Sequence, residues 1–360
     1  MSERTSQIEQ FLTEAGWDIA SRDPVPGDAS TRAYQRLDRA GERAILMDAP
    51  PGLEAPNEPE GATESERRAL GYNAVARLAG PDPAAFACIA HALRQRGFSA
   101  PKILAADLDH GLLLLEDFGA DVYAPVIAQT PAVEAPLYEA AVETLGEIYR
   151  SSIPAQLTYN DATWRIRKYD DIALIAETNL LLDWYVPDAG IEVTDGMRED
   201  LHGLLGETFV HLDAHAPGLA LRDFHAENLF WLPDRKSVAR VGLIDFQDGL
   251  FVHPAYDLMS LITDIRRDVS PGAKEPLTAR FMDAAKLSDR AGFDAAYAVL
   301  SVQRGLKLLG FPVRADVRDG KPQYRALLPR VKRHLAEDLA HPAVASVRKW
   351  LTQVLPGELS

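Results

Sequence analysis

The sequence predicts an α+β fold with two parts, one small and sheet-rich, the other larger and mainly helical. The chain has 360 residues, of which 47% are hydrophobic, enough for a substantial core in two domains or in one two-lobed enzyme. Short apolar runs bounded by turn residues are typical of the first third, including the four leucines at 112–115. Beyond residue 119 the apolar residues recur largely at helical spacing. We therefore expect a sheet-rich lobe at 1–118 and a helical lobe at 119–360.

The elements of the first lobe can be assigned in order along the chain. A helix is expected at about 6–15, followed by strands at 34–37 and 44–49 that flank the turn DRAGE. The next segment, PPGLEAPNEPEGATES, is rich in Pro, Gly and Glu and predicts an exposed loop. Helices are then expected at 65–78 and 83–97. The strands KILAAD and GLLLLEDF complete the small sheet, and 116–119 form a hinge to the second lobe.

The second lobe is expected to be helical except around two motifs. Helices are predicted at 132–151, 169–184 and 195–215, and further helices extend from the motifs to the C-terminus. The segment 311–321 contains Pro, Gly and charged residues, which predicts a connection between two helices.

Two motifs indicate a reaction class. LRDFHAEN (221–228) and LIDFQD (243–248) place Asp223, Asn228 and Asp245 in the order of a phosphoryl-transfer site. The first carboxylate would orient the attacking hydroxyl, and the amide and the second carboxylate would hold Mg²⁺ against the phosphates. Either motif alone is equally compatible with a turn rich in Asp and Asn. Both in order, separated by a strand-turn-strand pattern, favour phosphoryl transfer.

At these residues the chain resembles the aminoglycoside phosphotransferase and choline kinase superfamily, which has the protein-kinase fold. The resemblance extends through DFHAENLFWL, VGLIDFQDGLFVHPAYDL and GDASTRAYQRL, and covers most of the chain outside about 55–82. Within the superfamily, the chain is similar to bacterial kinases that phosphorylate the anomeric hydroxyl of N-acetylmuramate and N-acetylglucosamine in peptidoglycan recycling. The resemblance implies ATP and Mg²⁺ as cofactors. It also implies structural support from His225 and from Asp257, for which a satisfied core histidine and a helix-capping aspartate are the alternatives.

The nucleotide is expected to contact two segments of the first lobe. PGDASTRAYQRL lies where kinases carry a phosphate-covering loop, although it has only one glycine, and an ordinary hairpin turn is the alternative. The hinge would contact the base through its backbone, which leaves ATP and GTP equally compatible with the sequence. The predicted nucleotide-binding residues are Ser30, Thr31, Arg32, Glu116, Asp117 and Phe118.

The chain departs from the protein-kinase pattern at the phosphate-binding lysine. Met47 occupies the matching strand position, and the helix expected at 83–97 contains no Glu that could pair with a lysine. Another cation must then compensate. Arg32 is the first candidate and Lys102 the second, with an ordinary surface cation as the alternative for each.

The acceptor site is expected shortly before the catalytic motif. A sugar site needs planar polar groups and an aromatic face, and ETNLLLDWYVPD offers both, although its leucines also fit a plain core helix. The candidate sugar-binding residues are Glu177, Asn179, Asp183, Trp184 and Tyr185. The lactyl carboxylate of N-acetylmuramate would suit an arginine such as Arg304 or Arg325, for which surface salt bridges are the alternative.

Composition limits the possible partners and location. The formal net charge of -15 argues against nucleic acid and favours a small-molecule substrate. The charged N-terminal segment lacks the apolar core of a signal peptide, and no apolar run approaches a membrane-spanning length, so a cytoplasmic protein is expected. No feature indicates a protein partner. Two other functions remain open: a kinase of another hydroxylated metabolite, such as an aminoglycoside or amino alcohol, and a nucleotide-binding pseudokinase regulator, suggested by the missing Lys and Glu.

Overall fold

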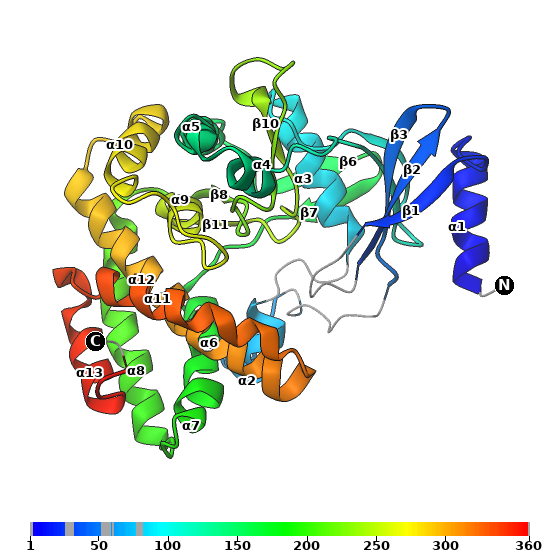
Figure 1. Cartoon of the computed structure of the whole chain (residues 1–360). Coiled ribbons are helices and arrows are strands. Elements are labelled where there is room, and N and C mark those ends of the chain that lie inside the picture. The colour runs from blue at the N-terminus through cyan, green and yellow to red at the C-terminus, as the bar shows by residue number, and fades with distance from the viewer. Residues whose placement is uncertain (1–2, 26–31, 52–58, 60, 77–81, 359–360) are drawn as a thin grey trace. The chain divides into compact units, whose positions relative to one another are not determined.

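The computed structural model describes residues 3–25, 32–51, 59, 61–76 and 82–358, and the chain forms two compact units (Figure 1). The first, here called the sheet unit, comprises Met1–Asn57, Leu78–Ile166 and Ala226–Gly249. The second, here called the helical unit, comprises Glu58–Arg77, Arg167–His225 and Leu250–Ser360. These units are contact clusters and do not coincide with the lobes expected at 1–118 and 119–360. The lobe boundary stays a prediction.

A five-stranded antiparallel sheet is the centre of the sheet unit, with strand order β1-β2-β3-β5-β4. Ala40 and Gly41 connect β2 to β3 with φ values of 53° and 92°, the left-handed pair that a tight hairpin turn requires. The strands expected at 34–37, 44–49, 102–107 and 111–118 are all present. The five strands are β1 (Ser21–Val25), β2 (Ala33–Arg39), β3 (Glu42–Asp48), β4 (Ile103–Asp107) and β5 (Leu112–Glu116).

One face of this sheet is covered by helix α1 (Glu3–Glu14). Ile8, Phe11 and Leu12 lie on one side of the helix because they are spaced by three and four residues, and they pack against Leu46 and Leu114. Alternate residues of a strand point to opposite faces. The intervening residues of β3 and β5 therefore point to the other face of the sheet.

Among the described residues, the rest of the sheet unit includes three α-helices and two hairpins. The helices expected at 83–97 and 132–151 are present, whereas the hairpin β6–β7, with strands of four residues each, was not predicted. These elements are α3 (Pro83–Gln95), α4 (Tyr123–Gln129), α5 (Glu134–Arg150), β6 (Gln156–Tyr159), β7 (Ala162–Arg165), β9 (Leu229–Trp231) and β10 (Val241–Leu243).

The helical unit is organised around the long helix α11 (Arg290–Asp319), which packs against α6, α9 and α12. At Gly310 the backbone of α11 approaches Leu180 so closely that a Cβ atom would lie 1.9 Å from the Leu180 carbonyl oxygen. The remaining elements are α2 (Glu64–Ala76), α6 (Asp171–Leu180), α7 (Val186–Asp188), α8 (Asp195–Thr208), β8 (Gly218–Ala220), β11 (Leu250–Val252), α9 (Ala255–Ile262), α10 (Lys274–Ala285), α12 (Leu328–Asp338) and α13 (Ala345–Val354).

The connection predicted at 311–321 is wrong, because α11 continues through Pro312 to Asp319. A proline inside a helix loses one backbone hydrogen bond. Here Pro312, Val313 and Ala315 are buried, so packing against neighbouring helices offsets that loss. The glycine did mark the end of the helix: Gly320 has a φ of 65°, and the N–H groups that follow the helix donate back to its last carbonyls.

Two further features concern the helical predictions. The helices expected at 169–184 and 195–215 are shorter, and their C-terminal parts become a π-helical turn at Leu181–Tyr185 and a 3₁₀-helix at Phe209–Ala214. Among all helices of the described residues, none combines the length and apolarity needed to cross a membrane.

Candidate active site

Asn228 and Asp245 meet at the open end of one hairpin in the sheet unit. Strands β9 and β10 pair antiparallel with Leu229 opposite Leu243, so the residues just before β9 and just after β10 become neighbours. The Ile244 N–H donates to the Asn228 carbonyl at 3.2 Å, and Asn228 Nδ2 donates to Asp245 Oδ2 at 3.3 Å. The amide and carboxylate predicted from the two motifs are therefore in contact.

The turn after β10 directs the Asp245 side chain. Asp245 has a φ of 58°, a left-handed conformation that costs free energy for a residue with a Cβ atom. The next residue, Phe246, is fully buried and stacks on Phe86 of α3 with a centroid distance of 4.9 Å. Gln247 Nε2 also donates to Asp245 Oδ1 at 2.8 Å. Packing and hydrogen bonding together hold the strained backbone.

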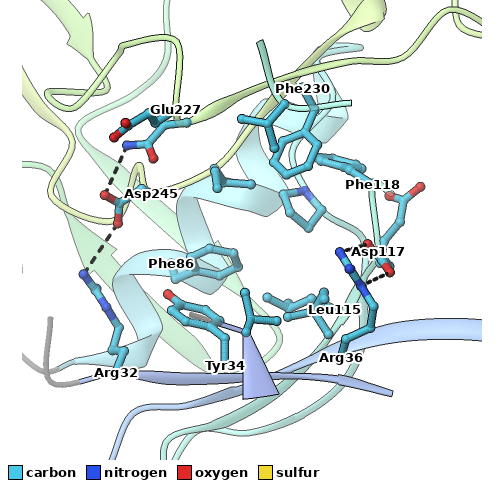
Figure 2. Close-up of a pocket in the computed structure, with 17 residues that line it drawn as sticks. Arg32, Tyr34, Arg36, Phe86, Leu115, Asp117, Phe118, Glu227, Phe230 and Asp245 are labelled. Atoms are coloured by element: carbon cyan, nitrogen blue, oxygen red, sulfur yellow. Dashed lines mark hydrogen bonds and ion pairs between the residues drawn. The ribbon is translucent and has the colours of Figure 1, made fainter. Parts of the chain in front are cut away.

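A cavity of about 450 Å³ lies beside this hairpin, within the sheet unit (Figure 2). Its walls are largely apolar, with Arg32, Glu227 and Asp245 at one end and Arg36 and Asp117 at the other. The apolar lining consists of Val25, Ile45, Phe86, Pro101, Leu115, Phe118, Val122, Phe230 and Ile244. The polar lining consists of Arg32, Tyr34, Arg36, Glu116, Asp117, Glu227, Asn228 and Asp245.

The predicted hinge residues Glu116, Asp117 and Phe118 all line the cavity. Arg36 Nε donates to Asp117 Oδ2 at 2.8 Å, and Arg36 Nη2 donates to the Gly119 carbonyl at 3.1 Å. The Gly119 N–H donates to Asp117 Oδ1 at 2.8 Å, and the Asp117 side chain is only 3% exposed. The Asp117 carboxylate therefore fixes the backbone of the predicted hinge.

The Glu116 side chain of the hinge is also held by polar contacts. Glu116 is engaged by Arg235 from the β9–β10 connection in a short ion pair, and by the Lys102 N–H at 3.1 Å. Arg235 Nη1 also donates to the Ser99 hydroxyl at 2.7 Å, and its guanidinium lies 5.2 Å from the Phe118 ring centroid. One arginine thus connects the hairpin that carries Asn228 and Asp245 to the hinge.

Arg32 is the predicted cation that reaches the cavity. Arg32 Nη2 lies 3.6 Å from Asp245 Oδ1, whereas Lys102 is not among the described lining residues. Met47 is 1% exposed and shares the cavity-facing side of β3 with Ile45 through strand alternation. Ser30 and Thr31 lie outside the described residues.

Sequence reasoning missed Arg36 and Glu227. Arg32, Tyr34 and Arg36 all line the cavity and alternate along the chain, so the period of a strand was the available signal for Arg36. Glu227 lines the cavity next to Asn228. No sequence signal distinguished it from an ordinary exposed glutamate.

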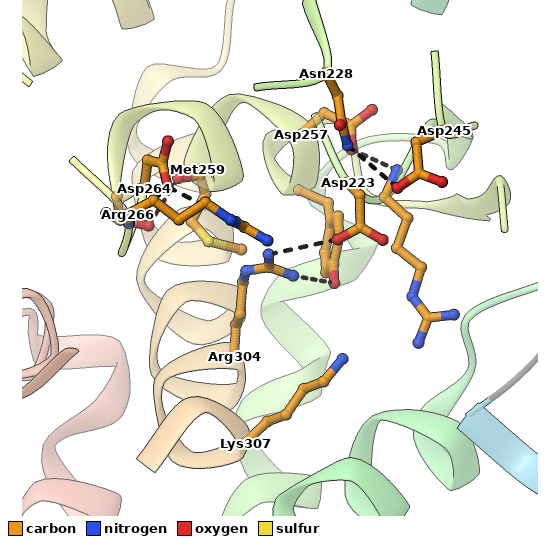
Figure 3. Close-up of polar contacts among 12 residues, drawn as sticks. Asp223, Asn228, Asp245, Asp257, Met259, Asp264, Arg266, Arg304 and Lys307 are labelled. Carbon is orange, nitrogen blue, oxygen red and sulfur yellow. Dashed lines mark hydrogen bonds and ion pairs between the residues drawn. The ribbon is translucent and has the colours of Figure 1, made fainter. Parts of the chain in front are cut away.

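The helical unit holds Asp223 on a braced loop (Figure 3). The N–H groups of Leu221 and Arg222 donate to the two carboxylate oxygens of Asp257 at 2.5 and 3.0 Å. These contacts are the ones that the expected bracing role of Asp257 requires. Burial raises the Asp257 pKa to about 7. The two backbone hydrogen bonds lower the pKa, but by less than burial raises it.

Arg222 has a φ of 73°, and its side chain forms an ion pair with Glu177 of α6. Arg222 Nη2 lies 2.7 Å from Glu177 Oε1, and Lys307 Nζ of α11 lies 2.6 Å from the same oxygen. Tyr169 donates a short hydrogen bond to the other oxygen. Burial opposes ionisation of Glu177, but Lys307 and Arg222 lower its pKa to about 2. Glu177 is therefore an ionised, interior carboxylate.

Asp223 remains accessible beside a buried cation. Its side chain is 38% exposed, and Arg304 Nη2 lies 4.0 Å from Asp223 Oδ1. Partial burial opposes ionisation, but the positive charges led by Arg304 outweigh it and hold the Asp223 pKa below its usual range. His225 is buried, and burial and the charge of Arg266 lower its pKa to about 3, so the ring is neutral at pH 7. This state suits the expected supporting role of His225.

Four of the five predicted sugar-binding residues have polar contacts inside the helical unit, and Trp184 is the fifth. Asn179 Oδ1 accepts from Arg198 at 2.7 Å, and Asp183 Oδ1 accepts from the same arginine at 2.7 Å. The Tyr185 hydroxyl donates to Glu358 at 2.7 Å, and Trp184 is half-buried. Glu177 is 0% exposed and pairs with Arg222 and Lys307. The sugar-binding role of all five residues stays a prediction.

The two arginines considered for a substrate carboxylate differ in environment. Arg325 forms the salt bridges that were the alternative to substrate binding. Its partners are Asp188, at 2.8 Å, and Asp316. Arg304 is 11% exposed and lies beside Asp223.

Comparisons with known proteins identify the family of the chain. The family model described as the phosphotransferase enzyme family matches residues 22–296. The chain belongs to this family. A relative from Caulobacter vibrioides named N-acetylmuramate/N-acetylglucosamine kinase is 40% identical over 99% of this chain and 98% of its own length. A relative of the same name from Pseudomonas putida is 28% identical over 98% of this chain and 94% of its own length.

Solved structures of phosphotransferases share the fold. A choline kinase from Streptococcus pneumoniae superposes with a TM-score of 0.57 at 12% identity, covering 94% of this chain and 100% of its own. An aminoglycoside phosphotransferase with ADP bound has a TM-score of 0.54 at 14% identity, covering 93% of this chain and 96% of its own. These similarities confirm the α+β, protein-kinase-like fold class predicted from the sequence.

The residues present fit a magnesium ion that is shared with a nucleotide. Within the described part of the chain, no cluster of three or more His, Cys, Asp or Glu side chains has metal-binding geometry. Mg²⁺ does not need one, because in phosphate-transferring sites it takes one or two protein oxygens and completes its shell with phosphates and water. Asn228 and Asp245, at the end of the cavity, offer such a donor pair.

Proposed function

We propose that the chain is an ATP- and Mg²⁺-dependent kinase that phosphorylates the anomeric C1 hydroxyl of N-acetylmuramate and N-acetylglucosamine. The product would be the sugar 1-phosphate, formed in the recycling of cell-wall sugars. The observation that carries this proposal is the 40% identity to a kinase named for both sugars, which extends over nearly the full length of both chains. ATP is an intracellular metabolite, and this supports the cytoplasmic location expected from the sequence.

The nucleotide would bind in the cavity of the sheet unit. The hinge backbone at 116–118 would contact the base between apolar walls, and Arg32 would contact the phosphates in place of the lysine that Met47 replaces. Asn228 and Asp245 would hold Mg²⁺, which neutralises the charge that develops on the phosphate oxygens. Binding of the nucleotide together with Mg²⁺ would separate Arg32 from Asp245, because Arg32 would pair with the phosphates and Asp245 with the metal ion.

Asp223 would align the acceptor and take its proton. Its lowered pKa keeps the carboxylate ionised at neutral pH, ready to accept a hydrogen bond from the C1 hydroxyl. As the C1 oxygen bonds to the γ-phosphorus, the bond from that phosphorus to the β,γ-bridging oxygen breaks and ADP leaves. The hydroxyl proton passes to Asp223 late, because positioning and charge neutralisation dominate a loose transition state.

The position of the new phosphate provides the decisive test. A free amino sugar reduces ferricyanide through its open-chain aldehyde, and a phosphate on the anomeric oxygen abolishes this reaction. With ATP and Mg²⁺, either sugar should lose reducing power in step with ADP formation, and mild acid should restore it. The methyl glycoside of N-acetylglucosamine lacks a free C1 hydroxyl and is the matched control that should yield no ADP.

Each alternative function predicts a different result in this assay. ADP formation with persistent reducing power, or turnover of the methyl glycoside, would indicate phosphorylation of another hydroxyl. ADP formation only with an aminoglycoside or with choline would support a kinase of another metabolite. ATP binding without turnover of any acceptor would support the pseudokinase.

A further inference from the structure

We propose that Arg304 binds a carboxylate of the acceptor and so distinguishes N-acetylmuramate from N-acetylglucosamine. The inference rests on the proposed function and deepens it. The two sugars differ by the lactyl group, which adds one carboxylate. Arg304 would be the binding residue for that group, next to the carboxylate that orients the reacting hydroxyl.

Arg304 is held in a fixed position by the helical unit. It lies on α11, and its Nη1 donates to the Tyr256 hydroxyl of α9 at 3.0 Å. Tyr256 is 0% exposed and itself fixed by packing, and its ring lies 5.7 Å from the guanidinium carbon. A guanidinium fixed before the ligand arrives loses little conformational entropy on binding.

The contacts of Arg304 leave donors for a ligand. Its Nη2 is 4.0 Å from Asp223 Oδ1, beyond hydrogen-bond distance, so the two groups attract without a direct hydrogen bond. Apart from the bond to Tyr256, Arg304 donates no hydrogen bond to any of the described residues. A carboxylate could therefore accept two parallel hydrogen bonds from this guanidinium, the geometry that favours arginine at carboxylate sites.

The charge around Asp223 favours an anionic acceptor. Glu177 is ionised and neutralises part of the charge of Arg222 and Lys307, and the largely buried Arg304 is the cation beside the partly exposed Asp223. Arg266 is 36% exposed and adds a further positive charge, 3.8 Å from the buried Asp264. In a chain of net charge -15, this local excess of arginine and lysine is unsuited to a cationic acceptor such as an aminoglycoside.

The phosphates are a less suitable ligand for Arg304. The cavity proposed for the nucleotide belongs to the sheet unit and has its own cations, Arg32 and Arg36. Arg304 does not line that cavity and instead lies beside Asp223, which would face the acceptor. The acceptor carboxylate is therefore the anion that Arg304 fits.

The two sugars and two arginine variants form a thermodynamic cycle that tests the proposal. We would measure kcat/KM for both sugars with the wild type, Arg304→Met and Arg304→Lys. Arg304→Met should lower kcat/KM for N-acetylmuramate about 10- to 100-fold more than for N-acetylglucosamine, the size expected for a lost charge-assisted hydrogen bond to a carboxylate. Arg304→Lys keeps the positive charge but lacks the two parallel N–H donors of a guanidinium. It should therefore retain part of the preference for N-acetylmuramate that Arg304→Met loses.

Arg318→Met is the matched control, because Arg318 lies on the same helix, is 48% exposed and pairs with Asp319 at the helix end. It should affect both sugars equally and weakly. ADP binding and the thermal unfolding midpoint would establish that each variant is folded. If Arg304→Met does not fold, the Arg304→Lys variant provides the test. The proposal then predicts that its KM for N-acetylmuramate rises several-fold more than its KM for N-acetylglucosamine.

Two results would overturn the inference in different ways. Equal losses for both sugars would mean that Arg304 acts only on Asp223 or on the phosphoryl group, and the proposed kinase function would stand. If the wild type phosphorylated neither sugar, the proposed function would fall and this inference with it.

Discussion

Arg32 Nη2 and Asp245 Oδ1 lie 3.6 Å apart at one end of the cavity in the sheet unit. The arginine immediately precedes β2, and the aspartate follows β10, more than 200 residues later. The side chains are 17% and 32% exposed, so both remain accessible to a ligand. The ion pair thus joins the cation proposed for the phosphates to the carboxylate proposed for the metal.

Removal of the Arg32 charge should weaken ATP binding. We expect Arg32→Ala to raise the apparent KM for ATP about tenfold or more through loss of a charge-assisted phosphate contact. Lys102→Ala is the matched control, because that lysine does not line the cavity. Equal, negligible effects of the two changes would mean that backbone amides or another cation bind the phosphates.

Asp223→Ala should lower the rate of phosphoryl transfer without weakening nucleotide binding. The loss of a positioned acid-base group typically lowers turnover by about 10²–10⁴. ADP affinity should stay nearly unchanged, because Asp223 does not line the cavity proposed for the nucleotide. Steady-state kinetics and calorimetric titration with ADP measure the two quantities. Near-normal turnover would remove Asp223 from the mechanism.

Asn228→Ala and Asp245→Ala should change the dependence on metal. Each change removes one proposed protein oxygen, so we expect the Mg²⁺ concentration for half-maximal activity to rise in both variants. Asp234→Ala, an exposed residue in the connection at the other end of the same hairpin, should leave this concentration unchanged. The metal assignment fails if all three variants show the Mg²⁺ dependence of the wild type.

Glu177→Gln distinguishes an interior ion-pair role from sugar binding. The change leaves Arg222 and Lys307 without their shared buried carboxylate, which typically costs about 3–5 kcal/mol. We therefore expect a lower free energy of unfolding in urea and a lower kcat. Asp183→Asn, at a residue whose side chain is 45% exposed, is the control and should be nearly neutral for stability. A raised KM for sugar with unchanged stability would instead support Glu177 as a sugar ligand.

Asp257 should make stability depend on pH near neutrality. Its folded-state pKa, about 7, lies above the ordinary value for Asp, so the folded state binds the proton more tightly than the unfolded state. The resulting contribution is fully present below about pH 4 and is lost as pH rises through 7. Free energies of unfolding measured from pH 4 to 8 should fall less steeply with pH in Asp257→Asn. Parallel pH dependences in the two proteins would show that the Asp257 pKa is not raised.

The sequence alone determined the fold class, most helices and strands, and the partners Asn228 and Asp245. These features depend on local periodicity and on motif residues that flank one short hairpin, where β9 and β10 bring the two ends together. Arg32 could also be selected, because the missing lysine at Met47 required another cation nearby. The roles of these residues in catalysis remain predictions.

Only the tertiary structure decided which distant side chains meet. Arg304 lies beside Asp223, 81 residues away in the chain, and Glu177 is the interior partner of Arg222 and Lys307. Helical spacing indicates which face of a helix is apolar, but it does not specify which residue of another helix packs against that face. Packing between helices also explains two features of α11. It approaches α6 closely at Gly310, and it continues through Pro312. Long-range packing overrode local preference there, because burial of a whole helix face outweighs the loss of one backbone hydrogen bond.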